Sequence, residues 1–257
     1  MSTPFQTLNA EKLSDIKAFC DKQVDNGHLQ IIGAIPYEMR QDYLNELLPI
    51  QQRAIKNISI SSDRFRELAA TICDEISSYV TNEYGNDVYV VYPWRAALAF
   101  AFSFAKHENV HHCHLGISRD EHTLEAKEYL PFCSEDFVNI GHKKIVIADP
   151  MLATGGSIVY AIKKLQEMGI NEEQMIVTSV LSAPEGIQKL LSNYPSIKII
   201  TGTLDDHLNE LGFIVPGLGD FGDKWMENLK IEDFEIIRDI FSEIQWAKLR
   251  EKLNDLV

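Results

Sequence analysis

Residues 149–157 read DPMLATGGS, and they stand between an apolar run at 145–148 and a helical pattern at 158–168. This order predicts a strand, a tight loop and a helix. A loop rich in Gly, Ser and Thr at a helix start offers free backbone N–H groups and the positive end of the helix dipole to one anion. The acid at the strand end can accept hydrogen bonds from hydroxyls of the same ligand. The stretch therefore favours a ribose phosphate as its ligand.

Two better-known nucleotide motifs do not fit this loop. The spacing is wrong for a Walker loop, and no Lys follows the second glycine, Gly156. The G-x-G-x-x-G fingerprint of dinucleotide sites is also missing from it. Taken alone, Thr-Gly-Gly-Ser is also compatible with a capped strand-to-helix turn that binds nothing.

A second stretch decides between these readings. Residues 149–157 resemble the phosphoribosyl-diphosphate loop of uracil phosphoribosyltransferases residue for residue, and residues 212–224, GFIVPGLGDFGDK, resemble the uracil-binding segment of the same family. Weaker similarities occur at 64–68, 95–97, 116–121 and 183–187. The resemblance covers about residues 58–226. We therefore divide the chain into an N-terminal extension (1–57), a phosphoribosyltransferase domain (58–228) and a C-terminal helix (229–257).

Apolar strands alternate with helices through the middle of the chain. The expected strands are 88–92, 112–117, 145–148, 175–181 and 197–201, and the expected helices are 64–81, 96–107, 156–168 and 184–192. Continuous apolar strands indicate an α/β fold with a parallel sheet that is flanked by helices on both faces. The resemblance implies the type I phosphoribosyltransferase fold, which carries a small base-binding hood.

The flanking and connecting segments are less regular. Helical patterns at 10–23 and 37–56 enclose a strand-like stretch at 29–32, and helical spacing recurs at 231–257. Residues 118–141 form a long polar segment, which predicts a solvated loop or a hairpin. In the family that the chain resembles, a mobile loop in this region closes over the reacting sugar.

Bulk properties limit the classes of function. A chain of 257 residues with 45% hydrophobic and 24% charged residues is typical of a soluble globular protein. A net charge of −14 disfavours a nucleic-acid binder. No apolar stretch reaches membrane-spanning length, and the N-terminus lacks a signal pattern. Four widely spaced cysteines indicate reduced thiols in a cytoplasmic protein. The histidines near Cys113 alternate between strand faces, so we expect no metal site there.

The resemblance implies transfer of ribose 5-phosphate from its 1-diphosphate (PRPP) to N1 of uracil, which gives UMP and pyrophosphate. The expected catalytic residues are Arg95, Asp149 and Asp220. The expected donor-binding residues are Arg95, Arg119, Asp149, Pro150, Met151, Leu152, Ala153, Thr154, Gly155, Gly156, Ser157 and Asp220. The expected uracil-binding residues are Ile214, Gly219, Asp220 and Phe221.

Each expected role has a physical reason. The amides of 153–157 suit the 5-phosphate, and the guanidinium forks of Arg95 and Arg119 suit pyrophosphate. Asp149 faces the ribose hydroxyls, and the main chain at 214 and 219–221 reads the flat edge of uracil. Mg²⁺ is the expected cofactor. It arrives on the donor, because this hard cation prefers phosphate, ribose and water oxygens, so no protein metal site is predicted.

The chain departs from the family pattern in several places. Ala97 replaces a Gly and is expected to strain its turn if that turn needs an unusual backbone. Phe221 replaces an Ala and either points away from the base or narrows its pocket. Ser118 and Phe213 replace Tyr residues. Ala97 and Phe221 leave open a non-catalytic nucleotide- or PRPP-binding paralogue that acts as a sensor, and Phe221 leaves open a transferase for another base. An RNA-binding regulator with the same fold is a further alternative, which the net charge of −14 disfavours.

The expected partners follow from the same resemblance. Uracil and PRPP are the small-molecule substrates, in pyrimidine salvage, and GTP is a candidate effector. The stretch between Phe65 and Arg95 lacks the hairpin arm with which bacterial members dimerise. We therefore expect a homo-oligomer with a different interface, and no nucleic-acid or membrane partner.

Overall fold

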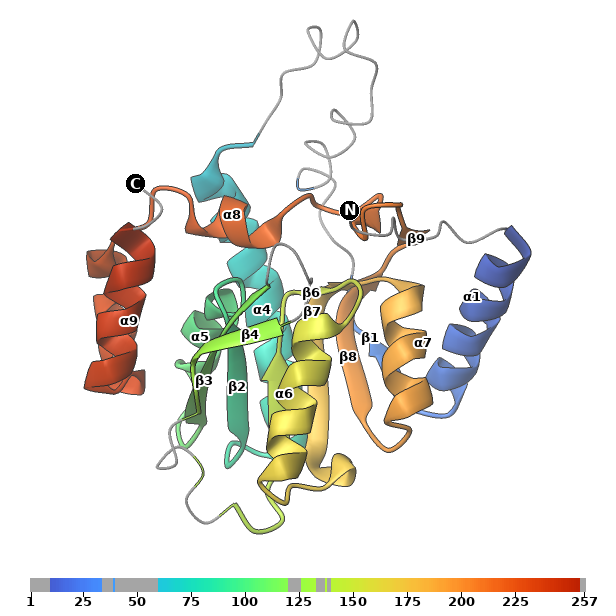
Figure 1. Cartoon of the computed structure of the whole chain (residues 1–257), viewed down its shortest axis with the longest axis horizontal. Helices are drawn as coiled ribbons and strands as arrows, with labels where there is room; N and C mark the ends of the chain where they lie inside the picture. The colour runs from blue at the N-terminus through green and yellow to red at the C-terminus, as the bar shows by residue number, and fades with distance from the viewer. Residues whose placement is uncertain are drawn as a thin grey trace, which may run out of the picture.

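The computed structural model describes residues 10–33, 39, 60–119, 126–132, 137 and 140–254. Its centre is a sheet with the strand order β1-β8-β7-β5-β2-β3-β4, and β6 also pairs with β7 (Figure 1). The strands are β1 (Leu29–Ile31), β2 (Tyr89–Trp94), β3 (His111–Arg119), β4 (Ala126–Leu130), β5 (Ile145–Ala148), β6 (Met151–Leu152), β7 (Met175–Ser182) and β8 (Lys198–Leu204). Every pair in this sheet is parallel except β3 with β4, so the expected parallel sheet is confirmed.

Helices cover both faces of the sheet (Figure 1). They are α1 (Ala10–Asp25), α4 (Ser62–Tyr84), α5 (Leu98–Phe104), α6 (Gly156–Glu167) and α7 (Pro184–Asn193). Alternate residues of strand β2 pack into the hydrophobic cores on opposite faces of the sheet. Val90 and Tyr92 pack with α4 and α5, whereas Tyr89 and Val91 pack with α6 and α7. Both sets are buried, which is why the strands read as continuous apolar runs rather than alternating ones.

Residues before position 58 contribute to the sheet. Strand β1 forms one edge of the sheet and pairs in parallel with β8, with Leu29 opposite Ile199. Helix α1 packs against α7, where the Cys20 thiol lies 3.8 Å from the carbonyl oxygen of Pro184. The helix expected at 37–56 falls outside the described residues, apart from Met39.

The described part of the polar segment at 118–141 contains strand β4. Strand β4 pairs antiparallel with β3, and the register shifts between Gly116 and Ile117. A Cβ atom at Gly116 would lie 2.5 Å from Cβ of Leu130 and 2.6 Å from Cε2 of Tyr129, so only glycine allows the two strands to approach this closely.

The expectation of one C-terminal helix is wrong. The structure has a 3₁₀ segment, η3 (Ile231–Ile240), followed by α9 (Glu243–Asn254). The break has a local cause, because Ser242 and Gln245 cap the start of α9 reciprocally. The amide of Ser242 donates to Oε1 of Gln245 at 2.7 Å, and the amide of Gln245 donates to Oγ of Ser242 at 3.3 Å.

Two further sequence expectations concern membranes and thiols. None of the helices in the described ranges combines the length and apolarity needed to cross a membrane. The described cysteines, Cys20, Cys73 and Cys113, are free and buried, and Cys133 falls outside the described residues.

Candidate functional site

Segments that follow three parallel strands meet at one edge of the sheet. They are the loop after β5, the turn after β2, and the stretch beyond β8 that holds β9 (His207–Leu208), β10 (Ile214–Val215) and α8 (Phe221–Met226). Figure 1 shows α8 and β9 above the end of the sheet at which α6 begins. Ligands of open parallel sheets bind at this carboxyl edge. We call residues 205–220 the hood.

The loop after β5 offers unpaired amides to an anion. Strand β6 anchors the loop by pairing with Leu181 and Ser182 of β7, and Gly155, with φ of 71°, turns the chain into α6. In the described part of the chain, the N–H groups of residues 154–157 donate to no protein acceptor. The N–H of Ala153 differs from expectation, because it donates to the carbonyl of Met151 at 3.0 Å. The free donors are therefore those of residues 154–157.

Asp149 is half-buried at the end of β5. Removal of its carboxyl group from water raises its pKa to about 6, and the amide of Met151, which donates to Oδ1 at 3.2 Å, partly opposes that rise. The group is mostly ionised at neutral pH, so it can accept hydrogen bonds from sugar hydroxyls beside the free amides.

Arg95 follows β2, and its peptide bond to Trp94 is cis. Its Nη2 atom lies 3.6 Å from Oδ1 of Asp223, and one third of the side chain is exposed. The expected strain at Ala97 is not found. Ala97 has φ of −61° and ψ of −16°, an ordinary right-handed conformation, and its methyl group is fully buried.

The hood is built from main chain. Strands β9 and β10 pair antiparallel, and the turn that follows contains Gly217 and Gly219, both with positive φ. A Cβ atom at Gly217 would lie 2.1 Å from the carbonyl oxygen of Ile214. Asp205, which is 8% exposed, accepts a 2.8 Å hydrogen bond from the amide of Gly217 through Oδ2. This buried carboxylate fixes the turn in which the uracil-binding residues were expected.

Phe221 points away from the open edge. Its ring is buried and meets the ring of Phe65 edge to face, with 5.3 Å between centroids. The side chain of Ile214 is buried as well. A base at this edge could therefore contact only the main chain of these two residues. Asp220 is exposed, and its Oδ1 caps α8 by accepting from the amide of Asp223 at 2.9 Å.

The three segments touch one another. A Cβ atom at Gly212 would lie 3.3 Å from Cγ2 of Thr154, so the hood rests on the loop after β5. A Cβ atom at Gly222 would lie 3.3 Å from Cβ of Ala96, so the start of α8 rests on the Arg95 turn. The structure thus gathers the expected residues at one edge, except that the side chain of Arg119, at the end of β3, lies outside the described residues.

Helix α7 supplies three residues that sequence reasoning missed. A Cβ atom at Gly186 would lie only 2.2 Å from the carbonyl oxygen of Ala153. Nζ of Lys189 donates to the carbonyl of Thr154 at 3.0 Å, and Oε1 of Glu185 accepts from the amide of Leu208 in the hood at 2.9 Å. Residues 183–187 resemble the family, so the sequence did mark this segment. The resemblance did not indicate what its residues contact.

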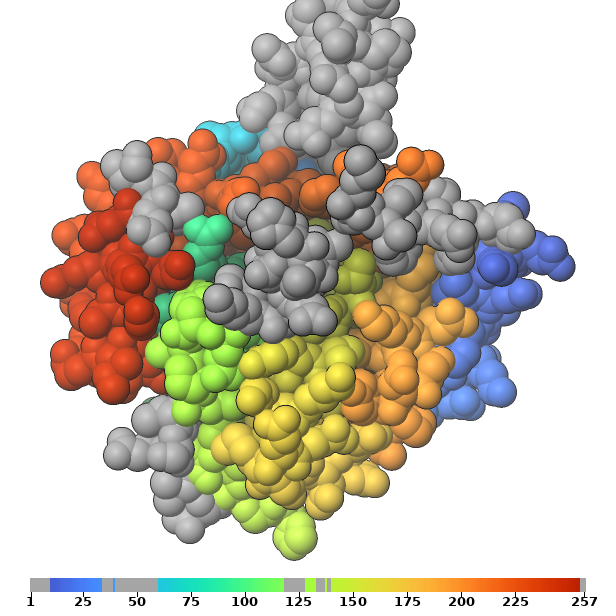
Figure 2. All heavy atoms as spheres, viewed as in Figure 1, coloured from blue at the N-terminus to red at the C-terminus, as the bar shows by residue number. Residues whose placement is uncertain are grey.

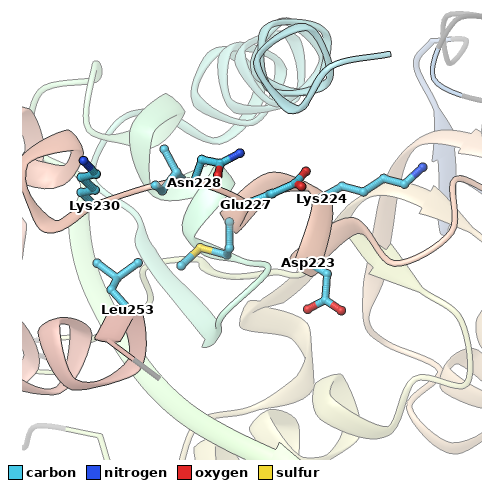
Figure 3. Close-up of a pocket in the computed structure, with 8 residues that line it drawn as sticks. Asp223, Lys224, Glu227, Asn228, Lys230 and Leu253 are labelled. Atoms are coloured by element: carbon cyan, nitrogen blue, oxygen red, sulfur yellow. The ribbon is translucent and has the colours of Figure 1, made fainter. Parts of the chain in front are cut away.

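A cavity of about 950 Å³ opens next to this site. Figure 3 shows Lys230 and Leu253 at one end of it, and Asp223 and Lys224 at the other. The ammonium groups of Lys224 and Lys230 point in different directions, so the lining does not converge on one ligand. Among the described residues, no group of three or more His, Cys, Asp or Glu side chains is placed to hold a metal ion.

Comparison with known proteins gives a family match. The family model described as uracil phosphoribosyltransferase matches residues 75–227. A uracil phosphoribosyltransferase of Streptococcus pyogenes serotype M1 is 48% identical over 111 residues, which cover 43% of this chain and 51% of that protein. The protein of the same name from Synechococcus elongatus is 45% identical over 112 residues, which cover 43% and 50%. The chain thus spans about half the length of the curated relatives it matches.

A solved structure has a similar fold. The AQ2163 protein from Aquifex aeolicus superposes with a TM-score of 0.61 at 23% identity, over 77% of this chain and 97% of that one.

Proposed function

Because the chain belongs to the uracil phosphoribosyltransferase family, we propose that its site transfers ribose 5-phosphate from PRPP to N1 of uracil and releases pyrophosphate. The observation that carries this proposal is the meeting of three elements at one sheet edge. They are the free amides of residues 154–157, the guanidinium of Arg95, and the main-chain turn that Asp205 holds.

The donor is oriented by the loop after β5. The free amides and the hydroxyls of Thr154 and Ser157 hold the 5-phosphate, and the N-terminal end of α6 adds its dipole. Asp149 accepts hydrogen bonds from the ribose hydroxyls and faces the positive charge that develops on the ring as the bond to the leaving group breaks. Arg95, together with Arg119, neutralises pyrophosphate. Most of the catalysis is therefore positioning and electrostatic stabilisation.

Uracil is read by the hood. Its alternating donors and acceptors meet the main chain at 214 and 219–221, since the side chains of Ile214 and Phe221 are buried. Asp220 lies between the base and the donor. Glycines at 217 and 219 allow the backbone to approach a flat ligand closely.

Mg²⁺ fits this site as an ion that the donor carries. The loop provides one carboxylate, Asp149, which is followed by Pro150 and which already accepts from the amide of Met151. Diphosphate, ribose and water oxygens would complete the coordination, and the ion would neutralise charge on the leaving group.

The two departures that favour a non-catalytic sensor do not obstruct the site. Ala97 has an ordinary backbone, and the Phe221 ring lies in the core. We therefore propose an active enzyme of pyrimidine salvage in the cytoplasm. A homo-oligomeric state and GTP as an effector are further proposals from the family resemblance.

The direct test of this function is product formation. Purified protein, PRPP, Mg²⁺ and uracil should give UMP and pyrophosphate in equal amounts, resolved by anion-exchange chromatography. Donor binding in a calorimeter without any product would support the sensor instead.

Substitution of Asp205 tests the role of the hood. Asp205→Ala removes the acceptor for the Gly217 amide, so the KM for uracil should rise about tenfold, which corresponds to one buried hydrogen bond. The KM for PRPP should stay within about twofold, because the donor loop is not held by this bond. Asp205→Asn keeps an acceptor oxygen and should restore most of the affinity. Steady-state kinetics with each substrate varied in turn give the answer, and equal changes in both KM values would contradict the assignment.

A further inference from the structure

The C-terminal addition, residues 231–254 (η3 and α9), lies beyond the family match, which ends at residue 227. It packs along β3 and β4. In Figure 2 the red surface of α9 abuts the green surface of the β3–β4 hairpin. We propose that this addition positions Arg95 for the donor through His114, which makes His114 a positioning residue. The inference rests on the proposed function, in which Arg95 binds the diphosphate.

His114 bridges the addition to the strand that ends before Arg95. Its side chain is fully buried in β3. The indole Nε1–H of Trp94 donates to Nδ1 of His114 at 3.0 Å, and Nε2 of His114 lies 3.0 Å from the carbonyl oxygen of Ile240. An indole N–H can only donate and a carbonyl can only accept. The neutral tautomer with its proton on Nε2 therefore satisfies both bonds at once.

Trp94 is the link to the site. It is the last residue of β2 and is bonded directly to Arg95. Phe241, between η3 and α9, stacks on His114 with 4.5 Å between centroids and meets Trp94 edge to face at 6.2 Å. Trp246 of α9 packs on Phe241 at 5.7 Å. The indole of Trp94 thus donates its hydrogen bond to His114 and meets the rings of both His114 and Phe241 edge to face.

The addition also contacts strand β4. Nζ of Lys252 lies 4.7 Å from the ring centroid of Tyr129 in β4. Burial raises the pKa of Tyr129 to about 12, and the charge of Arg95 acts in the opposite direction. Leu253 lines the cavity that ends at Asp223, the ion-pair partner of Arg95 (Figure 3). The addition therefore reaches β4 and one end of the cavity whose other end holds the partner of Arg95.

Two substitutions at His114 test the bridge. His114→Phe keeps an aromatic ring and removes both hydrogen bonds. The Kd and KM for PRPP should rise about tenfold, which corresponds to loss of the one buried bond that reaches Trp94. The KM for uracil should stay within about twofold. His114→Asn places an amide oxygen where Nδ1 stood and can again accept from Trp94, so it should recover most of the donor affinity. Calorimetric titration with PRPP and Mg²⁺ and steady-state kinetics provide the two readouts.

A matched variant separates positioning from general destabilisation. Leu165→Ala truncates a fully buried residue of α6 in the other core, and it should lower stability without changing the KM for PRPP. If His114→Phe does not fold, Phe241→Leu is measured instead. It keeps both hydrogen bonds and should raise the Kd for PRPP about threefold through loss of the stacked ring.

The outcomes distinguish this inference from the proposed function. A wild type that binds PRPP but forms no UMP would contradict the proposed function, and the Kd comparison would still test His114. If the wild type is active and His114→Phe binds PRPP with the wild-type Kd, the inference is overturned. If His114→Phe does not fold, a wild-type Kd in Phe241→Leu overturns it. Failure of the wild type to bind PRPP would overturn both.

Discussion

Gly186→Ala is expected to reduce kcat/KM for PRPP by about 100-fold, because a displacement of about 1 Å at a reacting centre has that effect. The added Cβ atom would lie 2.2 Å from the carbonyl oxygen of Ala153 and 3.0 Å from that of Leu152, so the donor loop must move away from α7. The substitution would otherwise favour α7, since alanine is the better helix former by about 1 kcal/mol. Steady-state kinetics and thermal unfolding of the same preparations separate the two effects.

Gly33→Ala is the matched control for this substitution. Gly33 follows β1, and the nearest atom to its added Cβ would be 3.7 Å away, at an ordinary contact distance. Its kinetics should stay within about twofold of wild type. Wild-type kinetics in Gly186→Ala would mean that the packing of the loop on α7 has no part in donor binding.

Asp149→Asn is expected to reduce kcat/KM for PRPP by about 100-fold or more, because it removes the charge that we propose faces the ribose while keeping the size of the side chain. The wild type should also lose activity below pH 6, where the carboxylate becomes protonated, since its pKa is about 6. Phosphate groups of PRPP titrate in the same range in both proteins. The ratio of wild-type to variant kcat/KM isolates Asp149, and it should fall as the pH is lowered from 7.5 to 5.

The same substitution should stabilise the fold at neutral pH. The pKa of Asp149 is raised in the folded state, so its contribution to stability is fully present below its ordinary value of 3.8 and is lost as the pH rises through 6. Asp149→Asn removes that loss. Its free energy of unfolding should exceed that of wild type at pH 7.5, and the difference should shrink toward pH 4. A variant that is less stable at pH 7.5 would contradict the burial of this charge.

The sequence predicts those parts of the fold that rest on periodicity and on local chemistry. The five expected strands of the sheet are present, and Gly156 begins α6 as expected. Strands β6, β9 and β10 were missed because two residues each are too few to show a period. The break before α9 had a signal in the sequence, since Ser242 and Gln245 have the spacing of a capping box, but the helical spacing of the apolar residues obscured it.

Some residues of the candidate site could likewise be predicted from the sequence, and others could not. The loop at 149–157 and the turn at 217–220 are contiguous strings, so their residues could be named before the structure. Gly186 and Asp205 act across 33 and 12 residues of sequence, on Ala153 and Gly217 respectively, and their contacts emerge only once α7 and β8 are placed beside the loop and the hood. The direction of the Phe221 ring likewise depends on Phe65, which lies on another helix.

A competition among bases tests the central proposal most directly. Wild-type protein is incubated with PRPP and Mg²⁺ in one mixture of uracil, cytosine, hypoxanthine, guanine and adenine, and the mononucleotides are resolved and quantified with the pyrophosphate. We propose that the main chain of the hood recognises uracil, because the side chains beside it are buried. UMP should therefore be the one nucleotide formed, with an equal amount of pyrophosphate. A different mononucleotide, or none while PRPP still binds, would contradict the proposal that this site makes UMP from uracil.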